Sequence, residues 1–370
     1  MHKRAIVCVT NDLCTDQRVH KTCMALGKCG YKVLEYGRLL NDSQPLERPY
    51  TTHRTKHWFN KGAQFYAEYN IRLFFFLIFS KFDLVFANDL DTLPATFLAS
   101  KIKGKKIIYD THEYFTETPE LTSRPVIQRI WKWIEALFFP KLKHIITVNN
   151  SIANLYKNAY NKDISVIRNI PLTYESKEIK SRTELNLPLD KKIIIIQGTG
   201  INIDRGAEEA CLALQHLDNV TLLIIGSGDV FPVLKKIVED NHLDKKVIFK
   251  SKMPFHELRA YTMNADLGLA IDKGTNLNYM FSLPNKLFDY IHAGIPVLSS
   301  ELTEIKNVVE KYQIGYFIQN HNPDHIAQTI KNIFLDQETY NRKKINTLTA
   351  KKILCWEEEE KILINIINTI

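Results

Sequence analysis

The chain has 370 residues, of which 45% are hydrophobic and 24% are charged, as in soluble globular proteins rather than disordered or fibrous ones. This length exceeds what one hydrophobic core usually serves, so we expect two domains. The formal net charge of +8 is uneven: residues 1–180 carry 27 Lys and Arg against 17 Asp and Glu, which leaves 22 and 24 for the rest. A basic first half favours an anionic partner surface. The basic residues are dispersed and form no recognised nucleic-acid motif, so nucleic acid is not the expected partner.

The six cysteines include no Cys-x-x-Cys pair and no metal-ligand spacing. They are typical of reduced, mostly buried thiols. Met1-His2-Lys3-Arg4 leads directly into a short strand pattern, so no signal peptide is expected. We therefore expect a cytoplasmic protein.

Short apolar runs that end in polar loops recur along the chain and predict β-strands. They lie at 5–10, 84–87, 106–110, 145–148, 193–196, 222–225, 267–271 and 297–299. Segments of helical period separate most of them, at 18–30, 92–103, 126–142, 207–217 and 231–241. This alternation predicts parallel sheets with helices on both faces. In such sheets, ligands bind beyond the carboxyl ends of the strands.

The segment 71–79 is strongly apolar but far shorter than the ~20 residues that a membrane span needs. Two interpretations fit it. One is a buried core helix, and the other is a helix in the membrane interface. Nearby basic and aromatic residues would assist the second, namely Arg54, Lys56, Trp58, Lys61 and Arg72.

The alternation pauses over the polar stretch 174–192, which contains Pro188 and predicts a domain linker. The expected fold is therefore α/β, with two doubly wound Rossmann-like domains, at 1–173 and 174–351, facing each other across a cleft. A last helix is predicted at about 352–370, because apolar residues recur at three- and four-residue spacing from Leu363 to Ile370.

In the first domain, Asp110-Thr111-His112-Glu113 directly follows a predicted strand, so His112 should project toward a ligand. A histidine there can bond a substrate hydroxyl and titrate near neutrality, or it can be a structural histidine tied to a loop carbonyl. Further candidates on this side are Glu113, the Asn88-Asp89 pair, and Asn11, Asp16 and Arg18 in a polar loop. That loop lacks a glycine-rich fingerprint, which argues against a dinucleotide cofactor. Asn88-Asp89 could bind a metal or sugar hydroxyls, and an Asx turn that caps the next helix explains the pair about as well.

In the second domain, two glycine-containing loops follow strands. Gly198-Thr199-Gly200 opens the first loop, and Arg205-Gly206 closes it before a helix. Gly226-Ser227-Gly228 forms the second, where an exposed turn is an equal alternative. Glycines allow close backbone approach, and an arginine can hold a phosphate with two donors. Neither loop has the spacing of a Walker P-loop.

The stretch 278–298 is the most informative of the chain. Pro284 suits the first turn of a helix and Gly294 its end. The amides of Asn285, Lys286 and Leu287, with the helix dipole and the Lys286 ammonium, would seat a phosphate. Asp289 lies one turn on and could accept hydrogen bonds from a ribose diol. An ordinary helix with a solvated Lys–Asp pair fits the spacing equally well.

Together these segments resemble the retaining, GT-B-fold glycosyltransferases of group 1 (family four) over nearly the whole chain. The segments that carry the resemblance are Asn11-Asp12 to Asp16-Gln17-Arg18-Val19, Ala87-Asn88-Asp89, Tyr109-Asp110-Thr111-His112-Glu113, Gly198 to Arg205-Gly206, Ile225-Gly226-Ser227-Gly228, Ala265-Asp266, and Ser282-Leu283-Pro284-Asn285-Lys286 to Asp289-Tyr290 with Gly294-Ile295-Pro296. The last segment is the most specific.

The resemblance implies a nucleoside diphosphate sugar in the second domain and an acceptor in the first. Arg205 and Lys286 would hold the diphosphate, Asp289 the ribose, and His112 would line the reaction centre. The donor loops would supply Gly198, Thr199, Gly200, Gly226, Gly228 and Ser282, Leu283, Pro284, Asn285. The C-terminal helix would cross back onto the first domain. No metal or other cofactor is expected.

Two positions depart from the family pattern. The Glu-x7-Glu motif ends here in Asp289, and its first Glu is replaced by Phe281. The contact to the donor sugar would then come from elsewhere, with Asn278 as one candidate, so the identity of the donor stays open. Thr199 stands where a basic residue is often found. The resemblance implies glycosyl transfer to an acceptor hydroxyl. The basic first domain and the apolar segment 74–79 favour a glycan or lipid-linked acceptor at the inner face of an anionic membrane, as in cell-surface polysaccharide or glycolipid synthesis. Two alternatives stay open: a sugar-nucleotide 2-epimerase of the same fold, and a nucleotide-sugar-binding protein without catalysis.

Overall fold

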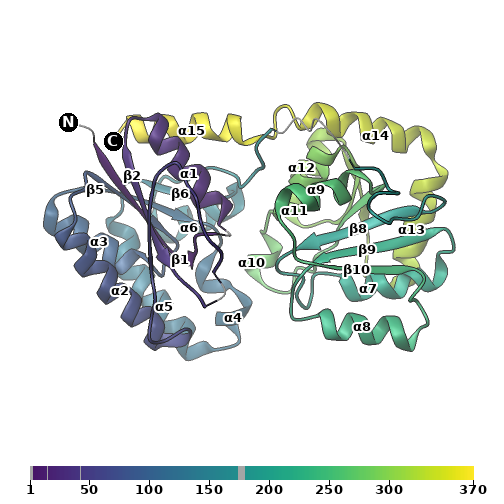
Figure 1. The fold of residues 1–370 in the computed structure, drawn as a ribbon, viewed down its shortest axis with the longest axis horizontal. Coiled ribbons are helices and arrows are strands. Elements are labelled where there is room, and N and C mark those ends of the chain that lie inside the picture. Colours follow the sequence, from purple (N-terminus) through teal and green to yellow (C-terminus); the bar gives the residue numbers. More distant parts are fainter. Residues whose placement is uncertain (1–2, 15, 42, 174–179) are drawn as a thin grey trace. The chain divides into compact units, whose positions relative to one another are not determined.

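The computed structural model describes residues 3–14, 16–41, 43–173 and 180–370. It divides the chain into two α/β units (Figure 1). Unit 1 comprises Met1–Asn169 and Glu359–Ile370, and unit 2 comprises Ile170–Glu358. The sequence analysis put the first boundary between residues 173 and 174. Residues 174–179 of the predicted linker lie outside the described residues.

Unit 1 is built on a parallel sheet, which within the described residues has the strand order β3-β2-β1-β4-β5-β6-β7. The strands are β1 (Arg4–Asp12), β2 (Lys32–Arg38), β3 (Thr51–Thr55), β4 (Leu84–Asn88), β5 (Lys106–Thr111), β6 (Ile145–Thr147) and β7 (Ser165–Val166). The helices are α1 (Gln17–Lys28), α2 (Gly62–Phe79), α3 (Leu93–Lys103), η1 (Phe115–Glu117), α4 (Pro119–Thr122), α5 (Pro125–Phe138), η2 (Phe139–Lys141), α6 (Asn150–Tyr160) and most of α15 (Trp356–Asn368).

Unit 2 repeats this plan with the strand order β10-β9-β8-β11-β12-β13, again parallel. The strands are β8 (Lys192–Gly198), β9 (Val220–Gly226), β10 (Val247–Ser251), β11 (Leu267–Ala270), β12 (Val297–Ser300) and β13 (Gly315–Ile318). The helices are α7 (Ala207–Ala213), η3 (Leu214–His216), α8 (Phe231–Asp240), α9 (Phe255–Met263), α10 (Leu277–Met280), α11 (Asn285–Ala293), α12 (Thr303–Tyr312), α13 (Pro323–Leu335) and α14 (Gln337–Ala350).

Alternate residues of β8 enter different hydrophobic cores. Ile194 and Ile196 pack into the core on one face of the sheet, while Ile193 and Ile195 pack into the core on the other. All four side chains are buried. Helices therefore cover both faces, which explains why such strands are continuous apolar runs. This confirms the predicted fold class of two doubly wound, Rossmann-like sheets.

The strand order changes direction at the first strand of each sheet. In unit 1, β1 lies between β2 and β4, and in unit 2, β8 lies between β9 and β11. At such points the connections leave the sheet in opposite directions, and the crevice between them binds ligands. The carboxyl ends of β1, β4 and β5, and of β8, β9 and β11, are thus the places to seek functional residues.

The C-terminal helix α15 begins at Trp356, four residues later than expected. The backbone N–H of Trp356 donates to the Pro171 carbonyl within unit 2 (2.9 Å). From Glu359 onward the helix belongs to unit 1, as the resemblance implied. There, the Glu359 carboxylate accepts a hydrogen bond from Arg168 Nε (2.8 Å), and Glu360 forms an ion pair with Lys28.

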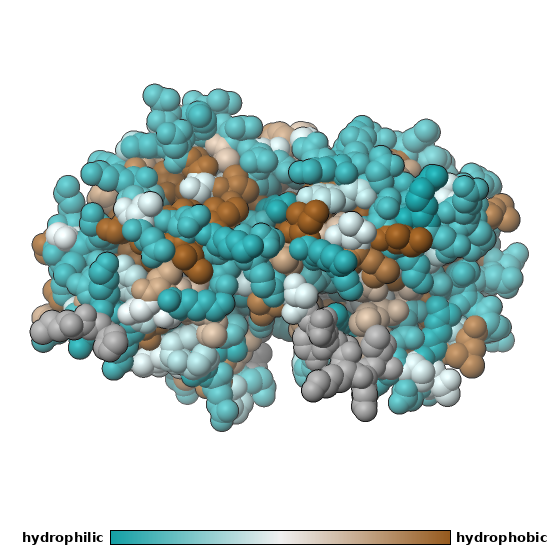
Figure 2. Space-filling model, turned by 90° about the horizontal axis from the view of Figure 1, so that it is seen from above, coloured by the Kyte–Doolittle hydropathy of each residue, from teal (hydrophilic) through white to brown (hydrophobic). Residues whose placement is uncertain are grey.

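Segment 71–79 lies in α2, which buries one face and exposes the other. One face of this helix, carrying Phe65, Tyr69, Leu73 and Leu77, is buried in the core. The opposite face exposes large apolar side chains, namely Ile71, Phe75 and Phe79. Among the described residues, no helix combines the length and apolar character needed to cross a membrane. On the face of the molecule in Figure 2, hydrophobic residues gather in several clusters within a mainly hydrophilic surface.

Candidate functional site

The two glycine loops of unit 2 are packed backbone against backbone. The Gly198 carbonyl accepts a hydrogen bond from the Ser227 N–H (3.1 Å), and the Ser227 carbonyl accepts one from the Ile201 N–H (3.0 Å). A Cβ added at Gly226 would lie 1.7 Å from the Gly198 oxygen, and the φ of Gly226 is +144°. Only glycine fits there. By contrast, an added Cβ at Gly200 would make only an ordinary van der Waals contact, with Asn202 Nδ2 at 4.0 Å.

Two predicted cationic residues converge on one carboxylate. Arg205 lies in the loop before α7, and Lys286 lies in the first turn of α11. Arg205 Nη1 is 2.9 Å from Asp272 Oδ1, and Lys286 Nζ is 2.9 Å from Asp272 Oδ2. Asp272 follows β11, so the fold brings three separate segments together at the carboxyl ends of the strands.

The carboxylate in this cluster is more deeply buried than its two cations. The Asp272 side chain is 0% exposed, whereas those of Arg205 and Lys286 are 22% and 11% exposed. The Arg205 guanidinium carbon also lies 3.9 Å from the centre of the Tyr279 ring, a cation–π contact. The cluster carries two positive charges and one negative charge, so it favours an anion on its accessible side.

Electrostatics keep the Asp272 carboxylate ionised. Burial alone would raise its pKa, but Lys286 and Arg205 outweigh burial and lower the pKa below its usual value. The sequence analysis did not select Asp272. The sequence did contain a signal for this residue, because Asp272 comes directly after the predicted strand 267–271. A lone carboxylate in a loop, however, matches no motif.

The start of α11 differs in detail from the prediction. Pro284 is the N-cap residue rather than part of the first turn, and no side chain caps the helix. The Leu287 N–H donates to the Pro284 carbonyl (3.1 Å), so it is already used. Of the three backbone N–H groups predicted to bind a phosphate, those of Asn285 and Lys286 therefore remain as candidates. Leu283 packs against the hydrophobic core of unit 2, and Ser282 Oγ donates to the Tyr279 carbonyl (3.0 Å).

Asp289 lies one turn after Lys286 and is held by a polar chain. Gln197 Nε2 donates to Asp289 Oδ2 (3.0 Å), and Thr262 Oγ1 donates to Gln197 Oε1 (2.6 Å). Asp289 and Gln197 line a small cavity in this unit. Nearby, Phe281 is partly exposed and Asn278 is buried.

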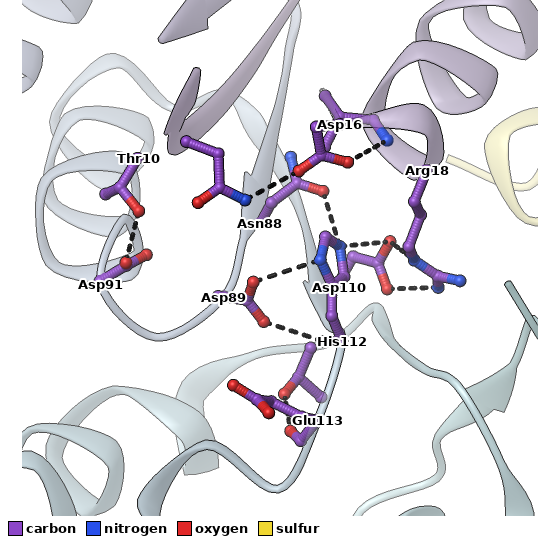
Figure 3. A network of polar contacts seen from close by, with 12 residues as sticks. Thr10, Asp16, Arg18, Asn88, Asp89, Asp91, Asp110, His112 and Glu113 are labelled. Atoms are coloured by element: carbon purple, nitrogen blue, oxygen red, sulfur yellow. Dashed lines mark hydrogen bonds and ion pairs between the residues drawn. The ribbon is translucent and has the colours of Figure 1, made fainter. Parts of the chain in front are cut away.

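In unit 1, the structure brings four predicted residues into one network (Figure 3). His112 follows β5; its Nδ1 is 3.2 Å from Asp89 Oδ2, and its Nε2 is 3.2 Å from Asn88 Oδ1. His112 Nε2 is also 3.5 Å from Asp110 Oδ2. Arg18 Nη2 and Nε donate to the two oxygens of Asp110, at 2.7 and 2.9 Å. The imidazole therefore lies between two carboxylates, one of which is anchored by an arginine.

This environment makes His112 a cation at neutral pH. Burial opposes its charge, but Asp89 and Asp110 outweigh burial and raise the pKa of His112 to about 9. Burial likewise opposes ionisation of Asp110, while Arg18 and His112 lower its pKa to about 2. The sequence analysis expected His112 to titrate near neutrality, so this expectation changes. Charged His112 can donate hydrogen bonds or a proton, but it cannot act as a base.

The other candidates of unit 1 have local partners. Asn11 Nδ2 donates to Asp16 Oδ2 (3.0 Å), and Asp16 caps α1 by accepting from the Val19 N–H (3.0 Å). Arg18 is 3% exposed, and its Nη1 donates to the Ile167 carbonyl, so it holds Asp110 rather than facing solvent. Glu113 is partly exposed, and its carbonyl accepts from Thr111 Oγ1 (2.7 Å).

Solved structures share this architecture. Sucrose-phosphate synthase of Thermosynechococcus elongatus superposes with a TM-score of 0.82 at 14% identity, covering 100% of this chain and 99% of that one. Anabaena HepE, solved in complex with UDP and glucose, superposes with a TM-score of 0.75 at 13% identity, covering 100% of both chains. These likenesses establish the GT-B fold.

Two family models match the chain. The model described as glycosyl transferases group 1 matches residues 177–348, and the model described as glycosyltransferase family 4 matches residues 16–170. The chain belongs to the group 1 glycosyltransferases. Over 168 residues it is 28% identical to the amylovoran biosynthesis glycosyltransferase AmsK of Erwinia amylovora, covering 44% of this chain and 39% of that protein. The chain spans well under half the length of the curated relatives it matches.

The raised pKa of His112 predicts a pH-dependent stability. Its contribution is fully present below the unfolded pKa of 6.5 and is lost as the pH rises through about 9. We expect the difference in unfolding free energy between the natural protein and His112→Gln to shrink by about 3 kcal/mol between pH 6 and pH 10. Urea unfolding at each pH measures this. A difference that is constant with pH would show that folding does not shift the pKa of His112.

Proposed function

We propose that the protein is a retaining glycosyltransferase that moves a sugar from a nucleoside diphosphate sugar to an acceptor hydroxyl. The observation that carries this proposal is the convergence of Arg205 and Lys286 at the carboxyl ends of the unit 2 strands. Departure of the diphosphate is the costly step, because negative charge develops on the β-phosphate oxygen. Cations held in place beforehand stabilise that charge without further reorganisation.

The remaining candidates of unit 2 fit the other parts of such a donor. At Gly200 the backbone has no side chain of its own, and an added Cβ would meet only Asn202 Nδ2, at 4.0 Å, so a sugar or phosphate could approach this backbone. Asp289 is one helical turn from Lys286, a spacing that suits a ribose next to a diphosphate. The two side-chain cations supply the charge that a metal ion supplies elsewhere, so we propose transfer without a metal. Chelation with EDTA should leave the rate unchanged.

In unit 1, we propose that His112 supports transfer to the acceptor. As an imidazolium, it directs Nδ1–H toward Asp89 and Nε2–H toward Asn88 and Asp110, so a hydroxyl of the sugar would share one of these N–H groups with its present acceptor. The name of the Erwinia amylovora relative supports a polysaccharide product, so we propose a glycan or lipid-linked acceptor and a role in cell-surface polysaccharide or glycolipid synthesis. His112→Ala should then nearly abolish transfer while the fold persists.

We also propose peripheral association with an anionic membrane at its cytoplasmic face. Helix α5 exposes apolar side chains along one stripe, namely Val126, Ile130, Trp133 and Leu137. Two basic residues of the same helix, Arg129 and Lys132, are exposed beside that stripe. Helix α3, which packs against α5, and helix α2, which packs against α3, expose further apolar side chains. An amphipathic helix with cations beside its apolar face is the arrangement that binds anionic lipid surfaces.

The diphosphate assignment predicts large effects from two single substitutions. Arg205→Ala and Lys286→Ala should each lower turnover by roughly 10²-fold, as loss of a donor to the developing charge does. Lys273→Ala is the matched control, because Lys273 adjoins Asp272 in sequence but its ammonium contacts Glu209 instead. The donor is first identified by thermal shift with UDP-, GDP- and ADP-sugars, and turnover is followed by NMR.

Three outcomes would contradict this proposal. Full activity in both variants would show that the diphosphate does not bind at this cluster. Turnover of the donor in the absence of any acceptor would indicate a 2-epimerase, and donor binding without any turnover would indicate a binding protein.

The membrane proposal is tested with vesicles that contain phosphatidylglycerol. Ile130→Asp should weaken sedimentation with these vesicles by about tenfold, since it removes apolar contact and adds a repelled charge. Ile345→Asp, which changes an exposed isoleucine of α14 in unit 2, should leave binding unchanged. Equal binding by the natural protein and Ile130→Asp would exclude the α5 stripe as the contact surface.

A further inference from the structure

Asp272 has an unusual place in the cluster of unit 2. Each of its two carboxylate oxygens lies against a different cation, Oδ1 against Arg205 and Oδ2 against Lys286, and both distances are 2.9 Å. The side chain is wholly buried, while both cations remain partly exposed. The carboxylate thus contacts the cations from the protein interior and leaves their outer side open.

We propose that Asp272 is a positioning residue, which fixes the separation and direction of Arg205 and Lys286 so that both donate to one diphosphate. This inference rests on the proposed function. Without the carboxylate, two like charges repel each other, and two long side chains regain rotamer freedom that ligand binding must then remove. With it, the cations are ordered before the ligand arrives, which is the requirement for electrostatic preorganisation.

A competing role for Asp272 makes the opposite prediction. Its carboxylate could be a stand-in for the phosphate, which occupies the phosphate position in the free protein and which the ligand must displace. In that case its removal would raise the charge of the cluster and strengthen anion binding. The burial pattern favours positioning, because a phosphate arrives from the exposed side of the cations, whereas Asp272 contacts them from behind. Both anions can therefore be bound together.

The chain contains a matched control at the other end of the same strand. Asp266, just before β11, lies between Arg182 Nη2 (2.8 Å) and Lys192 Nζ (3.6 Å). Asp266 and Asp272 each place a carboxylate between an arginine and a lysine. Asp266 lies at the amino end of the strand, where parallel sheets do not bind their ligands. It therefore separates the structural effect of losing such a carboxylate from the effect on the ligand.

The test is calorimetry of UDP, GDP and ADP, with uridine, guanosine and adenosine as phosphate-free probes, on the full chain. We expect Asp272→Asn to weaken binding of the nucleoside diphosphate about tenfold and to leave nucleoside binding unchanged. Asp266→Asn should change neither, although both variants lose some thermal stability. Natural affinity in folded Asp272→Asn would overturn the inference, and tighter binding would establish the stand-in role instead.

Two further results keep the inference separate from the proposed function. If Arg205→Ala and Lys286→Ala weaken binding while Asp272→Asn does not, only the positioning role fails. If the natural protein binds none of UDP, GDP and ADP, the proposed function itself fails. Should Asp272→Asn not fold, Asp272→Glu keeps the charge and moves it by one methylene. A folded Asp272→Glu protein that binds the diphosphate with natural affinity would also overturn the positioning role.

Discussion

The pairing of one buried carboxylate with two cations is the interaction on which the account of this protein depends. Asp272 is wholly buried, and it stays ionised because Arg205 and Lys286 are close to it. A buried carboxylate with a single partner, or with none, would be strongly destabilising. The same constraint holds the cations at the carboxyl ends of β8 and β11, where the strand order reverses and the sheet can bind a ligand.

Unit 1 contains the reverse arrangement. There, the imidazolium of His112 lies between the carboxylates of Asp89 and Asp110, and Arg18 neutralises the second carboxylate. These four groups balance in charge and have further carboxylates near them, Asp16 and Asp91, whereas the three groups of the unit 2 cluster keep one positive charge. A balanced polar site suits uncharged hydroxyl groups, and a positive site suits phosphate. The difference in charge agrees with the division of acceptor and donor that we propose between the two units.

The sequence predicted the interior of both sheets well and their edges poorly. Strands such as β8, buried on both faces, are continuous apolar runs that a pattern can find. The strands β3, β7, β10 and β13 were missed because each is at an edge of its sheet and only partly buried. The interior strand β2 was also missed, because Glu35 and Gly37 interrupt its apolar run. An edge strand such as Thr51–Thr55 resembles a polar loop in sequence, and only pairing with β2 makes it a strand.

The candidate site shows the same limit. Arg205 and Lys286 belong to recognisable segments, so sequence reasoning could select them, but nothing in either segment indicates their common partner. Asp272 becomes visible only when the order of the strands places β11 beside β8. The charged state of His112 could likewise not be predicted from the sequence, because it depends on Asp89, which follows a different strand and lies beside His112 only in the fold. Spacing identifies residue types, whereas pKa values depend on neighbours that are distant in sequence.

The most direct test of the central claim is a crystal structure of the protein soaked with UDP or GDP. The account predicts that the pyrophosphate oxygens lie within hydrogen-bond distance of both Arg205 and Lys286, with the carboxylate of Asp272 still between the two cations. A nucleotide bound elsewhere, or a pyrophosphate that contacts neither cation, would contradict it.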